Sequence, residues 1–426
     1  MRSAALLLLL AARPAAALES WAIDPATTGL LVEDHRAPLL EVEIEFPAGT
    51  WSPWVQQHDA DEAFEIQLYD PQAALRRRAD ALAATVSLSS GDRGSTLSLS
   101  CHKDDAAAAL ELVRQILGNR EFDRGELARR RQSEKLEWVA SSRQPQFALA
   151  QAAARILFAE GDPRRRPYER PRPATSDVAR LVAARDVLVR LPGRVVGFAG
   201  DVTLDQAQHL AQDLLPAAGG EAPPDLAPRL SPVVPAEHRP RATTVRLPRL
   251  TQAYMAYGRE SLRWIDPEYA ASQIADHALG GHFNSRLMLA LRQEGGDTYG
   301  ASVNSEGTID PDAYALISYS RTENAPALER KLREVLARFR SEGILESERL
   351  LAAGAIVGRR ALDHQTPGSL LREALTERRY GLPYGFFETQ AKRAAALTLD
   401  EVNAFIRSFY DPARFTLVTL IAQRPR

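Results

Sequence analysis

Cysteine is almost missing from this chain of 426 residues: Cys101 is its single example. The chain can therefore form no internal disulfide and no metal site built from several cysteines. Cys101 ends the alternating run from Thr96 to Ser100, which indicates a strand residue rather than a nucleophile. The sequence also lacks a Gly-x-Ser-x-Gly elbow and a cysteine–histidine signature, so the common motifs of nucleophilic hydrolases are excluded.

An excess of charge of either sign is absent as well. The 53 Lys and Arg residues nearly balance the 55 Asp and Glu residues, for a net charge of −2. This balance gives no electrostatic reason to expect nucleic acid as a partner. Two arginine-dense stretches, 129–131 and 164–166, are typical of solvated faces or loops. A hydrophobic share of 45% and a charged share of 25% are those of a globular protein.

No apolar run is long enough to span a bilayer. The N-terminus combines Arg2, an apolar run from Ala4 to Ala12 and three alanines at 15–17, a pattern typical of a secretory signal peptide. We expect residues 1–17 to be this signal peptide, with cleavage before Leu18. The mature protein should then be periplasmic or secreted, without a membrane span.

A proline-rich stretch at 216–241 cannot sustain a helix or a central strand. It predicts a linker between an N-terminal domain, 18–215, and a C-terminal domain, 242–426. The same order of elements follows on both sides at an offset of about 220 residues, which indicates an internal duplication. This order is a strand and a helix, a second helix, a helix begun by proline, and a last helix and strand. The paired segments are 96–101 and 313–319, 104–117 and 325–340, 125–141 and 347–362, the starts at Pro145 and Pro367, and 194–200 and 414–421.

Strands gather at the ends of each half and helices in its middle. This arrangement predicts an α+β fold of two homologous domains, each a mainly antiparallel sheet covered on one face by helices.

The block 279–303 places Arg292 and Tyr299 on either side of a predicted helix-to-strand junction. Helical periodicity runs from Asn284 to Gln293, and two glycines at 295–296 are a good terminator. An arginine can donate two hydrogen bonds to peptide carbonyls or to an oxyanion, and a tyrosine can donate a third. Without further context, an arginine at a helix C-terminus and a tyrosine in a strand are also ordinary structural residues.

With this block, most of the chain resembles the insulinase/pitrilysin-like zinc peptidases, the family of the mitochondrial processing peptidase and of paired bacterial subunits. The supporting segments are Trp21 to Gly49, Phe198 to Asp205, Thr398 to Val402, and Tyr410 to Pro412. The resemblance implies that Arg292 and Tyr299 hold the substrate opposite a zinc ion carried elsewhere.

The zinc motif of that family, His-x-x-Glu-His with a remote Glu, is absent. The nearest segment is 58–62, which puts Asp61 in the place of the general base and Glu62 in that of the second histidine. Glu134 or Glu137 lies at a plausible distance for the remote ligand. A shortened base and a lost imidazole should impair zinc binding and water activation, so we expect no cofactor on this chain. The alternative interpretation of the segment is an acidic first turn of a helix.

The remaining histidines do not replace the motif. His277 and His282 could meet only on a helix that continues through Gly280 and Gly281. The others are scattered and are expected to be structural or solvated: His35, His102, His209, His238 and His364. We expect Asn284 and Arg286 to brace the glycine turn rather than to act on a substrate.

Three hypotheses follow. The favoured one is a catalytically incomplete subunit of a heterodimeric zinc metallopeptidase, inactive alone, which supplies Arg292 and Tyr299 to an unfolded peptide while a homologous partner holds the zinc. The second is a non-proteolytic peptide-binding or scaffold protein of the same fold. The third is a weak zinc peptidase that uses His58, Asp61, Glu62 and Glu137.

Overall fold

The computed structural model describes residues 18–171, 174–219, 222–223, 225–248, 250–293, 298, 300–305 and 307–423. The predicted signal peptide, residues 1–17, and Tyr299 lie outside the described residues. In the ranges given, every helix is too short or too polar to cross a lipid bilayer.

The first half of the chain forms a six-stranded sheet in the spatial order β1-β2-β6-β3-β5-β4. Only β2 and β6 run parallel to each other, and the other neighbours are antiparallel. The strands are β1 (Leu18–Asp24), β2 (Thr27–Glu33), β3 (Leu39–Phe46), β4 (Thr85–Ser90), β5 (Ser95–His102) and β6 (Arg194–Gly200).

The second half forms a five-stranded sheet in the order β7-β11-β8-β10-β9, again with one parallel pair, β7 and β11. This order repeats β2-β6-β3-β5-β4 strand for strand, so the topology supports the duplication expected from the sequence. The strands are β7 (Ala242–Leu247), β8 (Gln252–Glu260), β9 (Ala301–Ser305), β10 (Ala313–Arg321) and β11 (Thr416–Ala422).

Most helices of each half cover one face of that half's sheet, where the two main cores lie. The helices of the first half are α1 (Pro53–His58), α2 (Ala60–Glu65), α3 (Ala74–Ala81), α4 (Ala106–Gly118), α5 (Arg124–Ser141), α6 (Pro145–Leu157), α7 (Val178–Leu188) and α8 (Leu204–Ala211). In the second they are α9 (Tyr269–Gly280), α10 (Arg286–Met288), α11 (Ala325–Glu342), α12 (Glu346–Asp363), α13 (Pro367–Arg379), α14 (Phe386–Ala396) and α15 (Leu399–Phe409).

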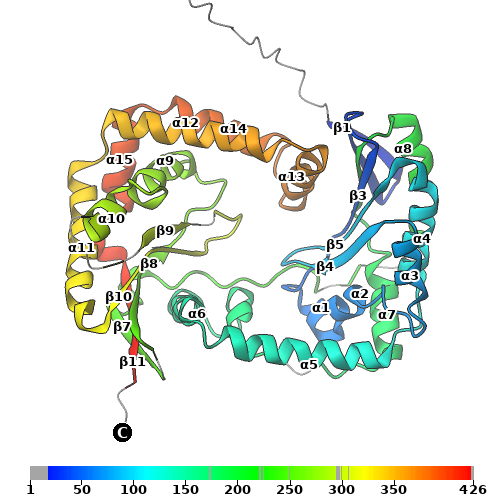
Figure 1. Ribbon diagram of the computed structural model, residues 1–426, viewed down its shortest axis with the longest axis horizontal. Coiled ribbons are helices and arrows are strands. Elements are labelled where there is room, and N and C mark those ends of the chain that lie inside the picture. Colours follow the sequence, from blue (N-terminus) through cyan, green and yellow to red (C-terminus); the bar gives the residue numbers. More distant parts are fainter. Residues whose placement is uncertain are drawn as a thin grey trace, which may run out of the picture.

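Two helices leave their own half and cover the inward face of the other sheet, the face that this sheet's own helices leave open (Figure 1). α13 places Leu371, Ala374 and Leu375 against Leu30 and Val195 of the first sheet. In the same way, α6 packs on β8, β10 and β11 of the second sheet. The sheets therefore stand at opposite sides of the molecule, with α5 and α6 along one edge and α12, α14 and α13 along the other (Figure 1).

Ion pairs reinforce the α13 contact. Arg379 Nε donates to Glu45 at 2.5 Å, and Arg372 Nη1 donates to Glu41 at 2.9 Å. Glu45 is buried, and burial raises its pKa despite the arginine. Just beyond the helix, Tyr380 donates its hydroxyl to Asp92 on the β4–β5 turn, at 2.9 Å from Oδ2. The two halves are thus joined by charge and hydrogen bonds as well as by apolar packing.

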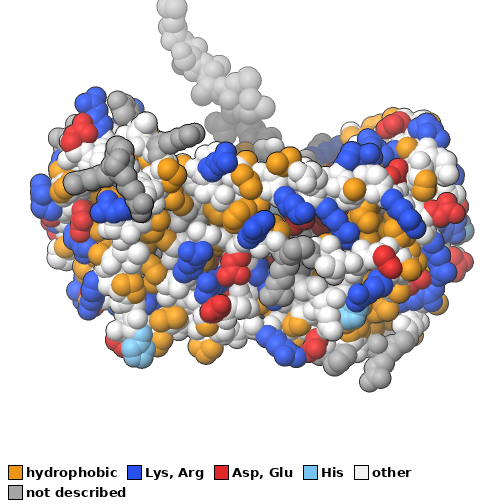
Figure 2. Space-filling view, turned by 90° about the horizontal axis from the view of Figure 1, so that it is seen from below, with side chains coloured by type: hydrophobic (Ala, Val, Ile, Leu, Met, Phe, Trp, Pro, Cys, Tyr) orange, Lys and Arg blue, Asp and Glu red, His pale blue; other side chains and the backbone are white. Residues whose placement is uncertain are grey.

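The face that carries α5 and α6 is mixed in charge. Lys and Arg side chains are spread over it together with Asp and Glu rather than gathered in one patch (Figure 2).

The predicted fold class is confirmed: two related α+β units, each with a mainly antiparallel sheet. The helix starts at Pro145 and Pro367 are confirmed too, as each proline stands at the first position of its helix. The prediction is incomplete in one respect, because the second face of each sheet is also covered, by the helix from the other half.

The α13 contact requires a glycine on the sheet. A Cβ at Gly197 would lie 2.5 Å from Cδ1 of the fully buried Leu371. We expect Gly197→Ala to destabilise the protein by about 1–3 kcal/mol through overpacking, and Leu371→Ala to cost about 2–4 kcal/mol. In urea unfolding, the double variant should lose clearly less than the sum, because the smaller side chain accepts the new methyl group. Strict additivity would contradict this contact.

Candidate functional site

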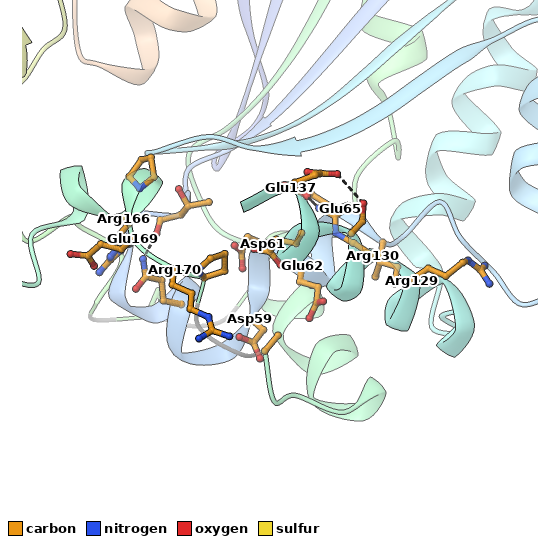
Figure 3. Close-up of a pocket in the computed structure, with 18 of the residues that line it drawn as sticks. Asp59, Asp61, Glu62, Glu65, Arg129, Arg130, Glu137, Arg166, Glu169 and Arg170 are labelled. Atoms are coloured by element: carbon orange, nitrogen blue, oxygen red, sulfur yellow. Dashed lines mark hydrogen bonds and ion pairs between the residues drawn. The ribbon is translucent and has the colours of Figure 1, made fainter. Parts of the chain in front are cut away.

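A cavity of about 880 Å³ opens in the first half of the chain. Its walls are the segment from Thr50 to Tyr69, which includes α2, the inner side of α5, and the 3₁₀ helix Pro163–Tyr168 with the residues that follow it. Asp61 and Glu62 lie in the middle of the cavity. Arg166 and Arg170 stand on one side, and Arg129 and Arg130 on the other (Figure 3).

The helix that faces the cavity is broken in two. Ser52 caps α1 and Pro53 opens it, and α1 ends at His58. Asp59 then has a left-handed backbone, with φ of 50°, before α2 begins at Ala60. A left-handed residue reverses the helical path, so His58 and Glu62 do not share one continuous helix face.

His58 is turned away from the cavity. Its Nδ1 donates to the carbonyl oxygen of Trp54 at 2.8 Å, and its ring stacks on the Trp54 indole at 5.1 Å between centroids. It is not among the residues that line the cavity. The expectation that Asp61 and Glu62 occupy a first helical turn is confirmed, since both lie in the first turn of α2.

An arginine neutralises Glu62. Nε of Arg131 donates to Oε1 at 2.8 Å and Nη2 to Oε2 at 2.6 Å, so the pair is bidentate. Nη2 of Arg131 also donates to the carbonyl oxygen of Ser176 at 3.0 Å. In this fork geometry a guanidinium holds a carboxylate strongly. Arg131 therefore supplies, from α5, the positive charge that a metal ion would supply to Glu62.

Other carboxylates of the cavity have no such partner. Burial raises the pKa of Asp61, and the neighbouring Asp59 and Glu62 raise it further. Glu134 is exposed on α5, and partial desolvation followed by the charge of Glu62 raises its pKa as well. Among the described residues, neither carboxylate forms an ion pair, so the cavity keeps a surplus of negative charge.

These residues do not fit a zinc ion. In the described part of the chain, no group of three or more His, Cys, Asp and Glu side chains is placed to hold a metal. Asp61, Glu62 and Glu137 do line one cavity, as the third hypothesis requires. However, His58, the only histidine of segment 58–62, is hydrogen-bonded to the carbonyl oxygen of Trp54, and Glu62 is paired with Arg131.

The second half has a different structure at the equivalent position. Its helix after the second strand, α9, continues unbroken to Gly280 and packs into the core. There Asp276 accepts hydrogen bonds from the hydroxyls of Tyr314 at 2.8 Å and Tyr410 at 2.6 Å. Desolvation still raises the pKa of Asp276 to about 6.

His277 and His282 come together although α9 ends at the glycine pair. Their ring centroids are 4.7 Å apart, because Gly281 turns the chain directly after the last helical residue. The sequence interpretation, which required a helix unbroken through both glycines, is wrong on this point. Arg286 forms a bidentate pair with Glu348, at 2.8 and 2.7 Å, so its guanidinium is engaged with α12 rather than with the glycine turn.

Arg292 lies in a short π-helical turn, Leu289–Gln293, which follows α10. Its side chain is exposed, and its guanidinium stands over the ring of Phe283 at 4.9 Å from the centroid. Within the described residues it forms no hydrogen bond or ion pair, and it does not line the cavity of the first half. Its predicted companion Tyr299 is outside the described residues, so their distance is not part of the structure.

Sequence reasoning missed Arg131. Its bond to Glu62 joins residues 69 positions apart, and no spacing rule connects α2 to α5. The available signal was the series of three arginines at 129–131, three residues before Glu134, on a helix with few apolar residues.

Comparison with known proteins shows what parts of this chain are similar to. Residues 192–352 match the family model described as the peptidase M16 inactive domain. The Helicobacter pylori protein described as non-peptidase homolog YmxG is 24% identical over 160 residues, which are 37% of this chain and 37% of that relative. The chain therefore matches little more than a third of that relative's length.

Solved structures extend the likeness over the whole fold. The peptidase M16 inactive domain from Pseudomonas fluorescens has a TM-score of 0.76 and 18% identity, covering 96% of this chain and 100% of that chain. The periplasmic protease PqqL from Escherichia coli also has a TM-score of 0.76, at 16% identity, and covers 95% of this chain but 45% of its own.

Because Glu62 is paired with Arg131, we expect zinc to change the thermal stability of the chain very little. We expect a few equivalents of zinc to change the thermal unfolding midpoint of the chelator-treated chain by less than about 1 °C. The reason is that the described residues form no metal site through which zinc could stabilise the folded state. Differential scanning calorimetry with magnesium as the parallel control measures this. A rise of several degrees that disappears in Glu62→Gln would contradict the arrangement.

The raised pKa of Asp276 predicts a pH effect on stability. Its pKa is higher in the folded protein, at about 6, than in the unfolded chain. The neutral form therefore favours folding at low pH, and this contribution is lost as the pH rises through about 4 to 6. Asp276→Asn keeps an oxygen that both tyrosines can reach. Relative to the unchanged protein, it should gain about 2 kcal/mol between pH 4.5 and pH 7.5 in urea unfolding. A constant difference across this range would count against the buried carboxyl.

Proposed function

We propose, from the premise that this chain belongs to the M16 peptidases, the insulinase/pitrilysin-like family, that it is the catalytically incomplete subunit of a two-chain peptidase. A homologous partner carries the zinc, and Arg292 and Tyr299 of this chain bind the peptide opposite that metal. The observation that supports this most directly is the bidentate pair of Glu62 with Arg131, in the segment that the resemblance aligns with the zinc motif of the family. A chain with this pair has no ion of its own to activate water.

The size of the unit supports a partner. This chain is similar over 95% of its length to PqqL but spans 45% of that protease. A complete peptidase of that kind therefore contains about twice the material present here. A second polypeptide of the same fold would supply the remainder, and the two would enclose an unfolded peptide.

Arg292 is suited to reach such a peptide. It is exposed, at the end of a short turn, and its guanidinium contacts only the face of Phe283 among the described residues. A guanidinium without a carboxylate partner keeps its donors for a peptide carbonyl or for the oxyanion of the transition state. The location that fits this function is the periplasm, for which the predicted signal peptide and the periplasmic relative PqqL are the supporting facts.

We expect Arg292→Ala to lower the kcat/KM of the reconstituted pair by about 100-fold, because a donor aimed at developing charge contributes about 3 kcal/mol. Tyr299→Phe should lower it less, and Arg292→Lys should restore part of the activity. The measurement is cleavage of an unstructured peptide, with subunit assembly followed by size-exclusion chromatography. Arg330→Ala, an exposed arginine on α11, is the matched control and should cleave normally.

The second candidate is a scaffold or peptide-binding protein without a role in proteolysis, which the name of the non-peptidase relative YmxG favours. It predicts that the partner cleaves equally well with the Arg292→Ala chain. Unchanged cleavage at unchanged assembly would therefore reject the peptidase proposal and retain this one.

A further inference from the structure

One face of α12 is apolar and open to solvent. The helix turns Ala352, Ala353 and Ile356 towards the core of the second half, where it packs on α9 and α14. Its opposite face carries four large apolar side chains, each between 48% and 61% exposed: Leu350, Leu351, Val357 and Leu362. α12 runs along one edge of the molecule, and these four residues do not line the cavity of the first half (Figure 1).

Small residues fill this face between the large ones, and all of them are exposed: Gly354, Ala355, Gly358 and Ala361. The two charged residues of the stretch 350–362 have partners within the chain. Arg359 is paired with Asp363 at 3.2 Å, and Arg360 donates to Glu373 at 2.6 Å. A contiguous exposed apolar face of this kind is typical of a surface that binds another molecule.

The two glycines of this face are not explained by the packing of the chain itself. A Cβ at Gly354 or at Gly358 would meet no atom within 4 Å, so the fold does not require a small residue at either position. Glycine inside a helix is destabilising relative to alanine. Two glycines one helical turn apart do allow a second backbone to approach the helix closely.

The spacing along the face is the same in both directions. Leu350, Gly354, Gly358 and Leu362 follow one another at intervals of four residues, which places them in one row on the helix surface. In two α12 helices that cross antiparallel about a two-fold axis, Leu350 of one copy meets Leu362 of the other, and the glycines face each other. This self-complementary pattern is what a symmetric contact between identical chains requires. The antiparallel arrangement also sets the two helix dipoles in opposition.

A lipid surface fits this face less well. Helices that lie on membranes are rich in Lys and Arg beside their apolar face, whereas α12 contains three acidic and three basic residues. A lipid surface also gives no reason for a pair of glycines at the centre of the face.

We propose that the exposed face of α12, from Leu350 to Leu362, joins two copies of this chain in solution, helix against antiparallel helix. One helix pair buries less than the roughly 800 Å² per partner of a standard interface. We therefore expect a weak dimer, with a dissociation constant on the order of 50 µM. This inference goes beyond the proposed function and does not depend on the zinc-bearing partner.

The test is sedimentation equilibrium of the expected mature chain, residues 18–426, alone and between about 5 and 500 µM. The Gly354→Leu/Gly358→Leu double variant enlarges the apolar face but blocks the close approach of a second helix. It should fold, because the added side chains meet no atom nearby, and circular dichroism with thermal unfolding checks this. Its dimer should be at least about 10-fold weaker. Gly118→Leu, at the exposed end of α4 and also without an atom within 4 Å, is the matched control and should dimerise like the unchanged chain.

Cysteine substitutions test the orientation of the two helices. Cys101 is buried, so a cysteine introduced on α12 is the accessible thiol of the chain. After mild oxidation, an equimolar mixture of the Leu350→Cys and Leu362→Cys chains should form disulfide-linked dimers. Each variant alone should form far fewer, because the antiparallel arrangement keeps identical positions apart.

A chain that is monomeric over the whole concentration range would overturn the inference. If that monomer floats with vesicles of phosphatidylethanolamine and phosphatidylglycerol, the face belongs to lipid. If it needs the two glycines to assemble with the zinc-bearing partner, the face belongs to that partner. A dimer that is equally strong or stronger in the double variant would also overturn the inference, since it would reflect unspecific apolar association. All these outcomes are separable from the proposed function, which is tested by the dependence of cleavage on Arg292.

Discussion

The reciprocal exchange of α6 and α13 is the constraint on which the rest of this structure depends. Each sheet has two apolar faces, and its own helices bury only one of them. The other face is buried by a helix that belongs to the opposite half, through Leu371 and its neighbours on one side and Ala148 and Leu149 on the other. Neither sheet can therefore be shielded from water unless both halves are folded together. The ion pairs of Arg379 and Arg372 act on top of this apolar requirement.

Most of the fold could be predicted from the sequence because the patterns that mark its helices and strands are local. Pro145 and Pro367 mark helix starts through their fixed φ, and alternation at 95–102 marks a strand. The repeated order of elements then indicated the duplication. The exchange of helices was not accessible, because periodicity tells which face of α6 is apolar but not which sheet that face will cover. The same limit applies to Gly197, whose importance is visible only from the position of Leu371.

Only part of the candidate site could be predicted from the sequence. Comparison with the zinc motif of the resembled family suggested that Asp61, Glu62 and a glutamate of α5 would meet, and they line one cavity. The chemistry of that cavity depends on a contact between distant residues and on a backbone conformation, and neither can be read from the sequence. The Glu62–Arg131 pair links two helices 69 residues apart, and the left-handed Asp59 breaks the helix without the glycine that usually signals such a turn. Arg292 was found through a family resemblance, and the structure adds that its guanidinium is exposed.

The exchanged helices and the cavity differ in how many segments of the chain must change together. Each exchanged helix belongs to the opposite half of the chain from the sheet that it covers, so an altered residue on either surface must be matched by a change in the opposite half. The cavity is different, since all of its described lining residues fall between Thr50 and Ala174. Substitutions within this single stretch can change the charge of the cavity without altering the contacts that dock the two halves.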